Sequence, residues 1–314
     1  MDQPTALAFV RRLAGKDLSL GGLEGGEIQV SGSSPMYPVG ISTGEVWHYT
    51  DVGGLRGILE SNSFWASSFR TMNDPGEIGY GLGIITEVWK SMEAKQPPEV
   101  VNFVAELLDP DSLLAAFEHV HLLSASRDGD SLSQWRSYAG TDGVSLGLAA
   151  RSALSSDPSG FDVSAPNIWG MSWIKVAYRR KVQIARCELF LHGILRDLEG
   201  STPPYDPAQR TAQQLQTILQ IVSFKHPAFV DERELRSTVM IGGAEPPVRQ
   251  RGNASVPYVP LIRLGPGNQV QRLPLTAVRY GPTATAGDIA KYRQVMVETG
   301  YGSVPLIGSE IPFR

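Results

Sequence analysis

Hydrophobic and polar positions follow two regular patterns along the chain from about residue 45 onward. Short runs rich in aromatic and β-branched residues predict strands, and apolar residues at helical spacing predict amphipathic helices. The first unit that these patterns define is a strand over residues 46–50, a helix over residues 51–60 and a strand over residues 63–67. Leu55, Ile58 and Leu59 supply the apolar face of this helix, and Asp51 is its expected N-cap.

The same patterns predict the elements in the rest of the chain. Further helices are predicted over residues 75–88, 98–108, 110–120, 130–138, 181–198, 207–224 and 285–299. Further strands are predicted over residues 120–126, 143–148, 171–178, 232–241, 257–264, 269–273, 275–280 and 304–307. These elements do not alternate regularly enough for a doubly wound parallel sheet. The sequence therefore predicts an α+β fold with a mixed or antiparallel sheet and flanking helices.

Residues 1–45 differ in composition from the rest. Residues 4–14 predict a short amphipathic helix, and residues 21–44 are rich in Gly, Ser and Pro, which is typical of a flexible connector. We expect residues 46–314 to form a single α+β domain. The two long helices predicted within residues 181–224 are expected to be a helical insertion in this domain.

Charge and hydropathy limit the classes of partner. The 314 residues include 28 Lys and Arg against 32 Asp and Glu, so the formal net charge of −4 creates no general basic field for nucleic acid or anionic lipid. A local basic groove stays open as an alternative. No apolar run is long enough to cross a bilayer, and the first residues lack the pattern of a secretory signal. We expect a cytoplasmic protein without a membrane partner, and delivery elsewhere by a specialised system is left open.

Cysteine and histidine usage argues against a resident metal. Cys187 is the single cysteine, which excludes an internal disulfide and a cysteine-rich metal motif. It lies in a predicted helix, where we expect it to be a small buried residue. The 5 His residues show no ligand spacing with carboxylates, so no metal is expected.

Polar residues at the ends of predicted elements are the first candidates for chemistry. His48 and Thr50 end the first strand, where a sheet fixes a side chain that still faces a ligand. The alternative is that they only terminate the strand. Asn73, Asp74 and Glu77 precede or open the helix that follows, and they suit either helix capping or the acceptor side of a functional site.

Trp135 and Tyr138 form an aromatic pair three residues apart on one predicted helix face. Such a pair is usually part of a core. Because polar Ser124, Ser126 and Arg136 lie near it in the sequence, a stacking platform is the alternative.

Glu232, Glu234 and Arg236 fall on one face if residues 232–241 form a strand. Two carboxylates and a guanidinium on one strand face are costly unless that face meets solvent or a polar site. A solvated edge strand and a functional site both satisfy this condition.

Seven segments together resemble a bacterial family known as domain of unknown function 2971. In the order of the family, they are residues 47–50 with the helix that carries Leu55, Ile58 and Leu59, residues 64–67, residues 73–75 with Glu77, residues 133–135 with Tyr138, residues 232–236, residues 281–282, and residues 309–314. Each segment is weak alone, but together they cover the chain from about residue 46 to its end.

The opening of the domain is also similar to the first unit of the ADP-ribosyltransferase superfamily, which includes DNA-modifying toxins and RNA 2′-phosphotransferases. It shares the His-x-Thr strand, the helix with its apolar face and the short Phe-Trp strand that follows. This resemblance implies a split mixed or antiparallel sheet with a cleft that binds NAD as a substrate. It also implies a later strand that presents a catalytic Glu.

The resemblance implies roles for individual residues on the NAD side. A strand-end His binds the nicotinamide-side ribose in that superfamily, so His48 is the expected ribose ligand, with Tyr49 and Thr50 beside it in the cofactor site. Trp135 or Tyr138 is the expected aromatic surface for nicotinamide. Arg70, Arg136 and Arg236 are the expected candidates for a pyrophosphate clamp, because a guanidinium matches phosphate geometry.

Glu234, with Glu232 two residues earlier, resembles the Glu-x-Glu pair of some transferases. Breaking the bond between nicotinamide and ribose builds positive charge on the sugar, which a nearby carboxylate stabilises. A second carboxylate takes the proton of the acceptor. The sequence does not distinguish which of the two is catalytic.

We therefore expect an NAD-dependent ADP-ribosyltransferase or NAD glycohydrolase, as a bacterial toxin or antiviral effector. Protein, nucleic acid and water all stay open as the acceptor. One alternative on the same fold is an enzyme that transfers or hydrolyses phosphate at RNA ends, which the acidic net charge disfavours. Another is a non-catalytic module that binds a nucleotide or a peptide.

Overall fold

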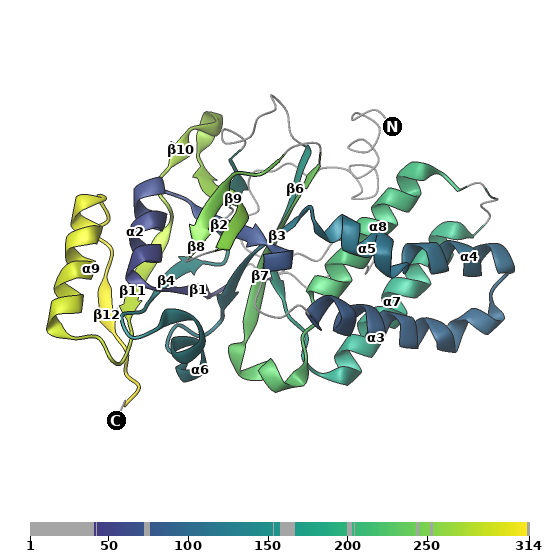
Figure 1. Ribbon diagram of the computed structural model, residues 1–314, viewed down its shortest axis with the longest axis horizontal. Helices are drawn as coiled ribbons and strands as arrows, with labels where there is room; N and C mark the ends of the chain where they lie inside the picture. Colours follow the sequence, from purple (N-terminus) through teal and green to yellow (C-terminus); the bar gives the residue numbers. More distant parts are fainter. Residues whose placement is uncertain are drawn as a thin grey trace. The chain divides into compact units, whose positions relative to one another are not determined.

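The computed structural model describes residues 41, 43–71, 76–152, 154–157, 167–199, 203, 205–242, 245–251 and 254–312. These residues fold into two compact units. The helical unit takes in the described parts of residues 72–120 and 175–228, and the sheet unit takes in those of residues 41–71, 121–174 and 229–314 (Figure 1). The helix expected over residues 4–14 lies outside the described ranges, and so does the connector expected over residues 21–44, apart from residues 41, 43 and 44. No helix in those ranges is long and apolar enough to span a bilayer.

The helical unit is larger than the expected insertion. Its helices are α3 (Gly76–Met92), α4 (Pro98–Leu107), α5 (Pro110–Phe117), α7 (Arg180–Leu198) and α8 (Pro207–Val222) (Figure 1). The sequence predicted one domain with an insertion over residues 181–224, and the structure adds α3, α4 and α5 to those helices. α3 belongs with these helices because it packs closely on α8. A Cβ added to Gly81 of α3 would lie only 3.0 Å from the Cα atom of Ile221 in α8.

The strands belong to a mixed, mostly antiparallel sheet, as the α+β prediction requires. They are β1 (Glu45–Thr50), β2 (Phe64–Ser68), β3 (Val120–Ser126), β4 (Val144–Ala149), β5 (Ser155–Ser156), β6 (Asn167–Lys175), β7 (Glu234–Gly242), β8 (Val248–Arg251), β9 (Ala254–Leu264), β10 (Val270–Gln271), β11 (Leu275–Tyr280) and β12 (Leu306–Gly308). The main path runs β10, β9, β2, β3, β1, β4, β11, β12; β7 pairs with β3 and β6, and β5 and β8 pair with β9. β11 and β12 pair in parallel.

Helices α2 (Val52–Ser61) and α9 (Ala286–Glu298) lie side by side along the sheet (Figure 1). The predicted apolar face of α2 joins the main core cluster, together with residues of α9 and of the strands. The predicted N-cap is confirmed, because Asp51 Oδ1 accepts the Gly54 N–H at 2.7 Å. An ion pair between Arg56 and Glu298 links the two helices at the surface.

The sheet branches at β3. β2 pairs with the first part of β3 through Ser67 and Leu122, whereas β1 meets its last residue through Trp47 and Ser126. β7 also pairs with β3. Because a strand has only two edges, at least two of these three partners share one edge at different points along it. Ser124 lies between the two pairing points.

Two of the predicted elements that carry candidate site residues differ in the structure. β7 begins at Glu234, not at Glu232, because Glu232 ends the 3-10 turn η5 (Pro227–Glu232) and Arg233 has a left-handed φ of 46°. The strand face predicted to carry both carboxylates therefore carries Glu234 and Arg236 only. The helix predicted over residues 130–138 is short: α6 (Leu132–Gln134) continues as the π-helical turn η3 (Trp135–Ala139).

Candidate functional site

Glu234 and Arg236 form a buried ion pair at the start of β7. Arg236 Nε donates to Glu234 Oε1 at 2.8 Å, and Arg236 Nη2 donates to Oε2 at 2.9 Å. The Arg236 side chain has 0% exposure and that of Glu234 has 7%. Ser124 Oγ donates a further hydrogen bond of 2.7 Å to Glu234 Oε1. A pyrophosphate would reach Arg236 only by displacing Glu234, so this arginine fits the expected phosphate clamp poorly.

Glu232 lies just before this pair and is half-buried. Its Oε1 accepts a hydrogen bond of 3.1 Å from the Tyr138 hydroxyl. Its main-chain oxygen accepts a hydrogen bond of 2.8 Å from Ser126 Oγ and another of 3.4 Å from Gln134 Nε2. The chain from β3 to η3 therefore holds the turn at Glu232 by both its main chain and its side chain.

His48 is connected to the same part of β3. Its Nδ1 lies 2.9 Å from the Ser124 carbonyl oxygen. A carbonyl oxygen only accepts hydrogen bonds, so Nδ1 carries the proton and Nε2 carries the lone pair of the neutral ring. The ring edge packs on Phe64, with ring centroids 5.5 Å apart.

Ser124 is the residue at which these groups meet: its main chain bonds His48 and its side chain bonds Glu234. Val46 and Leu235 both belong to the main core cluster. Because side chains alternate along a strand, His48 lies on the core side of β1, and Glu234 points away from the core side of β7. The two predicted site residues therefore approach Ser124 from different sides. Sequence reasoning noted Ser124 only as a polar neighbour of the aromatic pair, because its role depends on three strands that meet.

Tyr49 and Trp135 belong to a second apolar cluster. Trp135 is 3% exposed, and its ring meets that of Tyr49 edge to face at 4.7 Å. The Tyr49 hydroxyl donates to the Asp128 carbonyl oxygen at 2.7 Å and accepts the Ser131 N–H at 2.9 Å. Burial raises the pKa of Tyr49 above its ordinary value of 10.0. These two rings are therefore used within the fold, whereas Tyr138 packs at the border of the cluster.

The other predicted cofactor-site residues lie outside this network. Thr50 is half-buried at the end of β1, and Arg136 is exposed on η3. Arg70 is exposed on the turn η1 (Phe69–Thr71).

Of the residues predicted for the acceptor side or for capping, the structure describes Glu77. Glu77 belongs to the helical unit and forms a buried ion pair of 3.2 Å with Lys225 Nζ. Its position in the first turn of α3 agrees with the capping alternative. The partner that the ion pair gives it is the side chain of Lys225 and not a backbone N–H of the helix. Asn73 and Asp74 lie outside the described residues.

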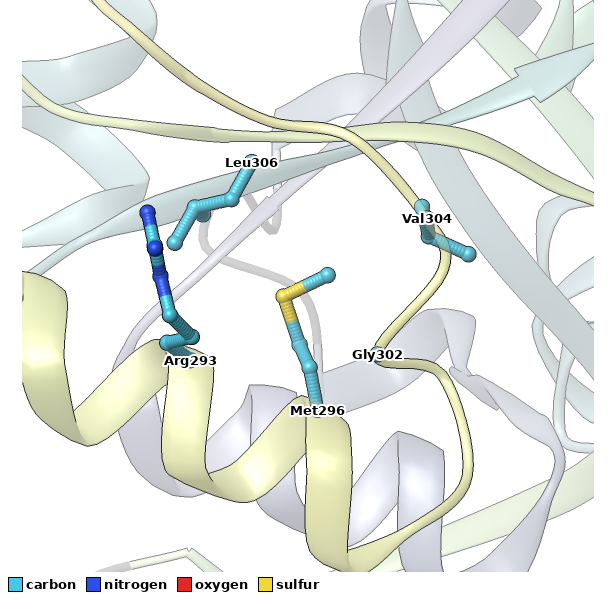
Figure 2. Close-up of a pocket in the computed structure, with 5 residues that line it drawn as sticks. All are labelled: Arg293, Met296, Gly302, Val304 and Leu306. Atoms are coloured by element: carbon cyan, nitrogen blue, oxygen red, sulfur yellow. The ribbon is translucent and has the colours of Figure 1, made fainter.

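A small pocket lies beside α9 in the sheet unit. Arg293 and Met296 of α9 line it together with Gly302, Val304 and Leu306 (Figure 2). Its volume is about 150 Å³. Pockets for drug-sized ligands measure roughly 300–1,000 Å³, so this one suits a group of a few atoms and not a dinucleotide.

The fold and the site describe an α+β protein with a polar cluster around two carboxylates, Glu232 and Glu234. Among the residues that the structure describes, no three His, Cys, Asp or Glu side chains are grouped to hold a metal ion. No protein-family model or curated protein matches the sequence, and no solved structure matches the fold. The function must therefore be argued from the geometry of this cluster.

Proposed function

We propose that the protein cleaves the bond between nicotinamide and ribose in NAD and transfers ADP-ribose to an acceptor. One observation carries this proposal: Glu232 and Glu234 flank the left-handed Arg233, and hydroxyl groups of Tyr138 and Ser124 hold their carboxylates. Strained backbone of this kind costs about 1–3 kcal/mol and clusters at functional sites. Fixed carboxylates suit the stabilisation of the positive charge that develops on the ribose ring.

The surroundings of the two carboxylates support different roles. Glu234 is buried and its charge is balanced by Arg236, so we assign it to fixing the start of β7. Glu232 is half-buried and is oriented by Tyr138, so we assign it to the anomeric carbon of the ribose.

The proposed reaction is a substitution at C1′ of that ribose. The bond from C1′ to the nicotinamide nitrogen breaks, and its electron pair goes to the nitrogen, which neutralises the pyridinium ring. The acceptor forms a bond to C1′ and gives its proton to the Glu232 carboxylate. With water as the acceptor, the same steps are NAD hydrolysis.

The role of His48 in the proposal comes from the resemblance, in which a strand-end His binds the nicotinamide-side ribose. The bond from its Nδ1 to the Ser124 carbonyl oxygen fixes the ring beside β3. The branch of the sheet at β3 supports an arrangement like that of ADP-ribosyltransferases, in which a split sheet surrounds the substrate. Membership of the domain of unknown function 2971 family belongs to the same proposal.

The test is release of nicotinamide from NAD by the purified protein, with and without nucleic acid or cell lysate. We expect Glu232→Gln to lower the rate by about 100-fold or more, which is typical of removing an electrostatic contact to a transition state. His48→Gln is expected to raise the KM for NAD, because its role is binding. Glu99→Gln, an exposed carboxylate of the helical unit, is the matched control and is expected to keep the full rate.

No release of nicotinamide by a folded protein under any of these conditions would reject the proposal. Removal of a 2′-phosphate from RNA ends without NAD cleavage would favour the alternative reaction on RNA.

A further inference from the structure

Asp130, in the loop between β3 and α6, joins three parts of the sheet unit. Its two side-chain oxygens accept hydrogen bonds from Trp135 Nε1 at 2.8 Å, Ser309 Oγ at 2.6 Å and the Glu310 N–H at 2.7 Å, and they face Arg279 Nη1 at 3.4 Å. The side chains of Asp130 and Arg279 are each 17% exposed. Loss of this carboxylate would leave the buried indole N–H of Trp135 without its acceptor, which is costly in a buried place.

The C-terminal segment is part of this network. Ser309 and Glu310 follow β12 directly and bond Asp130 by a side chain and by a main-chain N–H. Arg279 of β11 donates to the Gly308 carbonyl oxygen at 2.7 Å, and its guanidinium lies 5.9 Å from the centroid of the Trp47 ring. The segment is therefore fixed at three consecutive residues.

The opposite end of the network is the π-helical turn η3. Turns of this type are rare in proteins, and those that occur often lie at functional sites. Trp135 starts the turn. Its indole N–H donates to Asp130, and its ring packs edge to face with that of Tyr49. Three residues later, Tyr138 donates to Glu232.

We propose that Asp130 is the positioning residue of the site: by anchoring Trp135 to Ser309 and Glu310, it sets the π-helical turn that orients Tyr138 toward Glu232. Asp130 acts through these residues and does not touch the substrate. Ser309 and Glu310, which follow β12, are then part of the support of the site. This inference rests on the proposed function, because Glu232 is the carboxylate assigned to the ribose.

Two variants weaken the contacts of Asp130. Asp130→Asn replaces one of its two accepting oxygens with an amide NH2 group, and Ser309→Ala removes one donor. Asp288→Asn is the matched control, because Asp288 belongs to the same unit but caps α9 through Thr285.

The first measurement is hydrogen exchange of the amides of residues 132–139, which needs no activity. We expect exchange about tenfold faster in Asp130→Asn and Ser309→Ala, with no change in Asp288→Asn. The second is the kinetics of nicotinamide release, where we expect kcat to fall about 10- to 100-fold with little change in KM, as for a misplaced catalytic group.

The outcomes separate this inference from the proposed function. Unchanged exchange in both variants, or faster exchange with kcat intact, would overturn the positioning role. Faster exchange in a protein whose wild type does not cleave NAD would overturn the proposed function and would leave the link from Asp130 to Tyr138 in place.

Discussion

Arg236 carries a positive charge at a position with 0% exposure, and the carboxylate that balances it lies two residues away on the same strand. This arrangement explains how β7 tolerates Glu234 on a buried face. The Ser124 hydroxyl satisfies a further acceptor position of that carboxylate. At the scale of single residues, the fold around the proposed site needs both charges of this pair, because each one neutralises the other in a buried place.

Breaking one side of the pair should cost more than replacing both. We expect Arg236→Met to destabilise the protein by about 3–5 kcal/mol, because it leaves Glu234 charged and buried. The double variant Arg236→Met with Glu234→Gln is expected to lose less stability, because no unpaired charge is left in the buried place. Urea unfolding measures both, and Arg56→Met, which breaks a surface ion pair to Glu60 and Glu298, is the control with an expected loss of about 1 kcal/mol or less. Equal losses in the single and double variants would contradict this account of the pair.

Cys187 gives a prediction about pH. Burial raises the pKa of the Cys187 thiol from 9.0 to about 12. The folded state therefore keeps the thiol neutral, and this contribution to stability is full below pH 9.0 and is lost as the pH rises toward 12. We expect almost no reaction with a thiolate-directed disulfide reagent at pH 8 in the native protein, and prompt reaction in denaturant. Prompt reaction of the native protein would show that the thiol is accessible.

Single residues also show what a sequence can and cannot predict. The capping role of Asp51 depends on its immediate neighbours, and it was predicted correctly. The role of Ser124 depends on β1 and β7, which are remote in the sequence. Trp135 and Tyr138 differ in burial because the turn that contains them is π-helical, which their spacing does not reveal.

At the scale of elements, the local patterns predicted the strand, helix and strand at the start of the sheet unit to within one or two residues. The patterns failed to predict the start of β7, because the backbone conformation of a single residue sets it. Arg233 has a left-handed φ of 46°, and it separates the turn η5 from β7, so Glu232 leaves the strand. Neither the identity of Arg233 nor the apolar pattern around it indicates that conformation.

The packing of α3 on α8 can be tested with matched glycines. A Cβ at Gly81 would lie 3.0 Å from Ile221 Cα, whereas one at Gly79 or Gly83 would meet nothing within 4 Å. We expect Gly81→Ala to destabilise the protein by about 1–3 kcal/mol through overpacking. Gly79→Ala and Gly83→Ala should instead stabilise α3 by up to about 1 kcal/mol through helix propensity. Thermal unfolding of the three variants measures the difference, and a stabilising Gly81→Ala would contradict the close approach.

At the scale of the whole molecule, the described residues divide between a helical unit and a sheet unit, and two separate stretches of them belong to the helical unit. Periodicity predicted most of these helices but not which of them pack together, because an apolar face does not specify its partner. Glu232, which is assigned to the ribose, belongs to the sheet unit, as do Glu234 and His48. Glu77, which the sequence placed beside them as an acceptor-side candidate, belongs to the helical unit and pairs there with Lys225.

The central claim is that Glu232 acts on the ribose of NAD. Nicotinamide release by the wild type and by Glu232→Gln, measured side by side at saturating NAD, tests it most directly. The account predicts a measurable rate for the wild type and a fall of about 100-fold in the variant with its folded structure retained. Equal rates in the two proteins, or no release by a folded wild type, would contradict the claim.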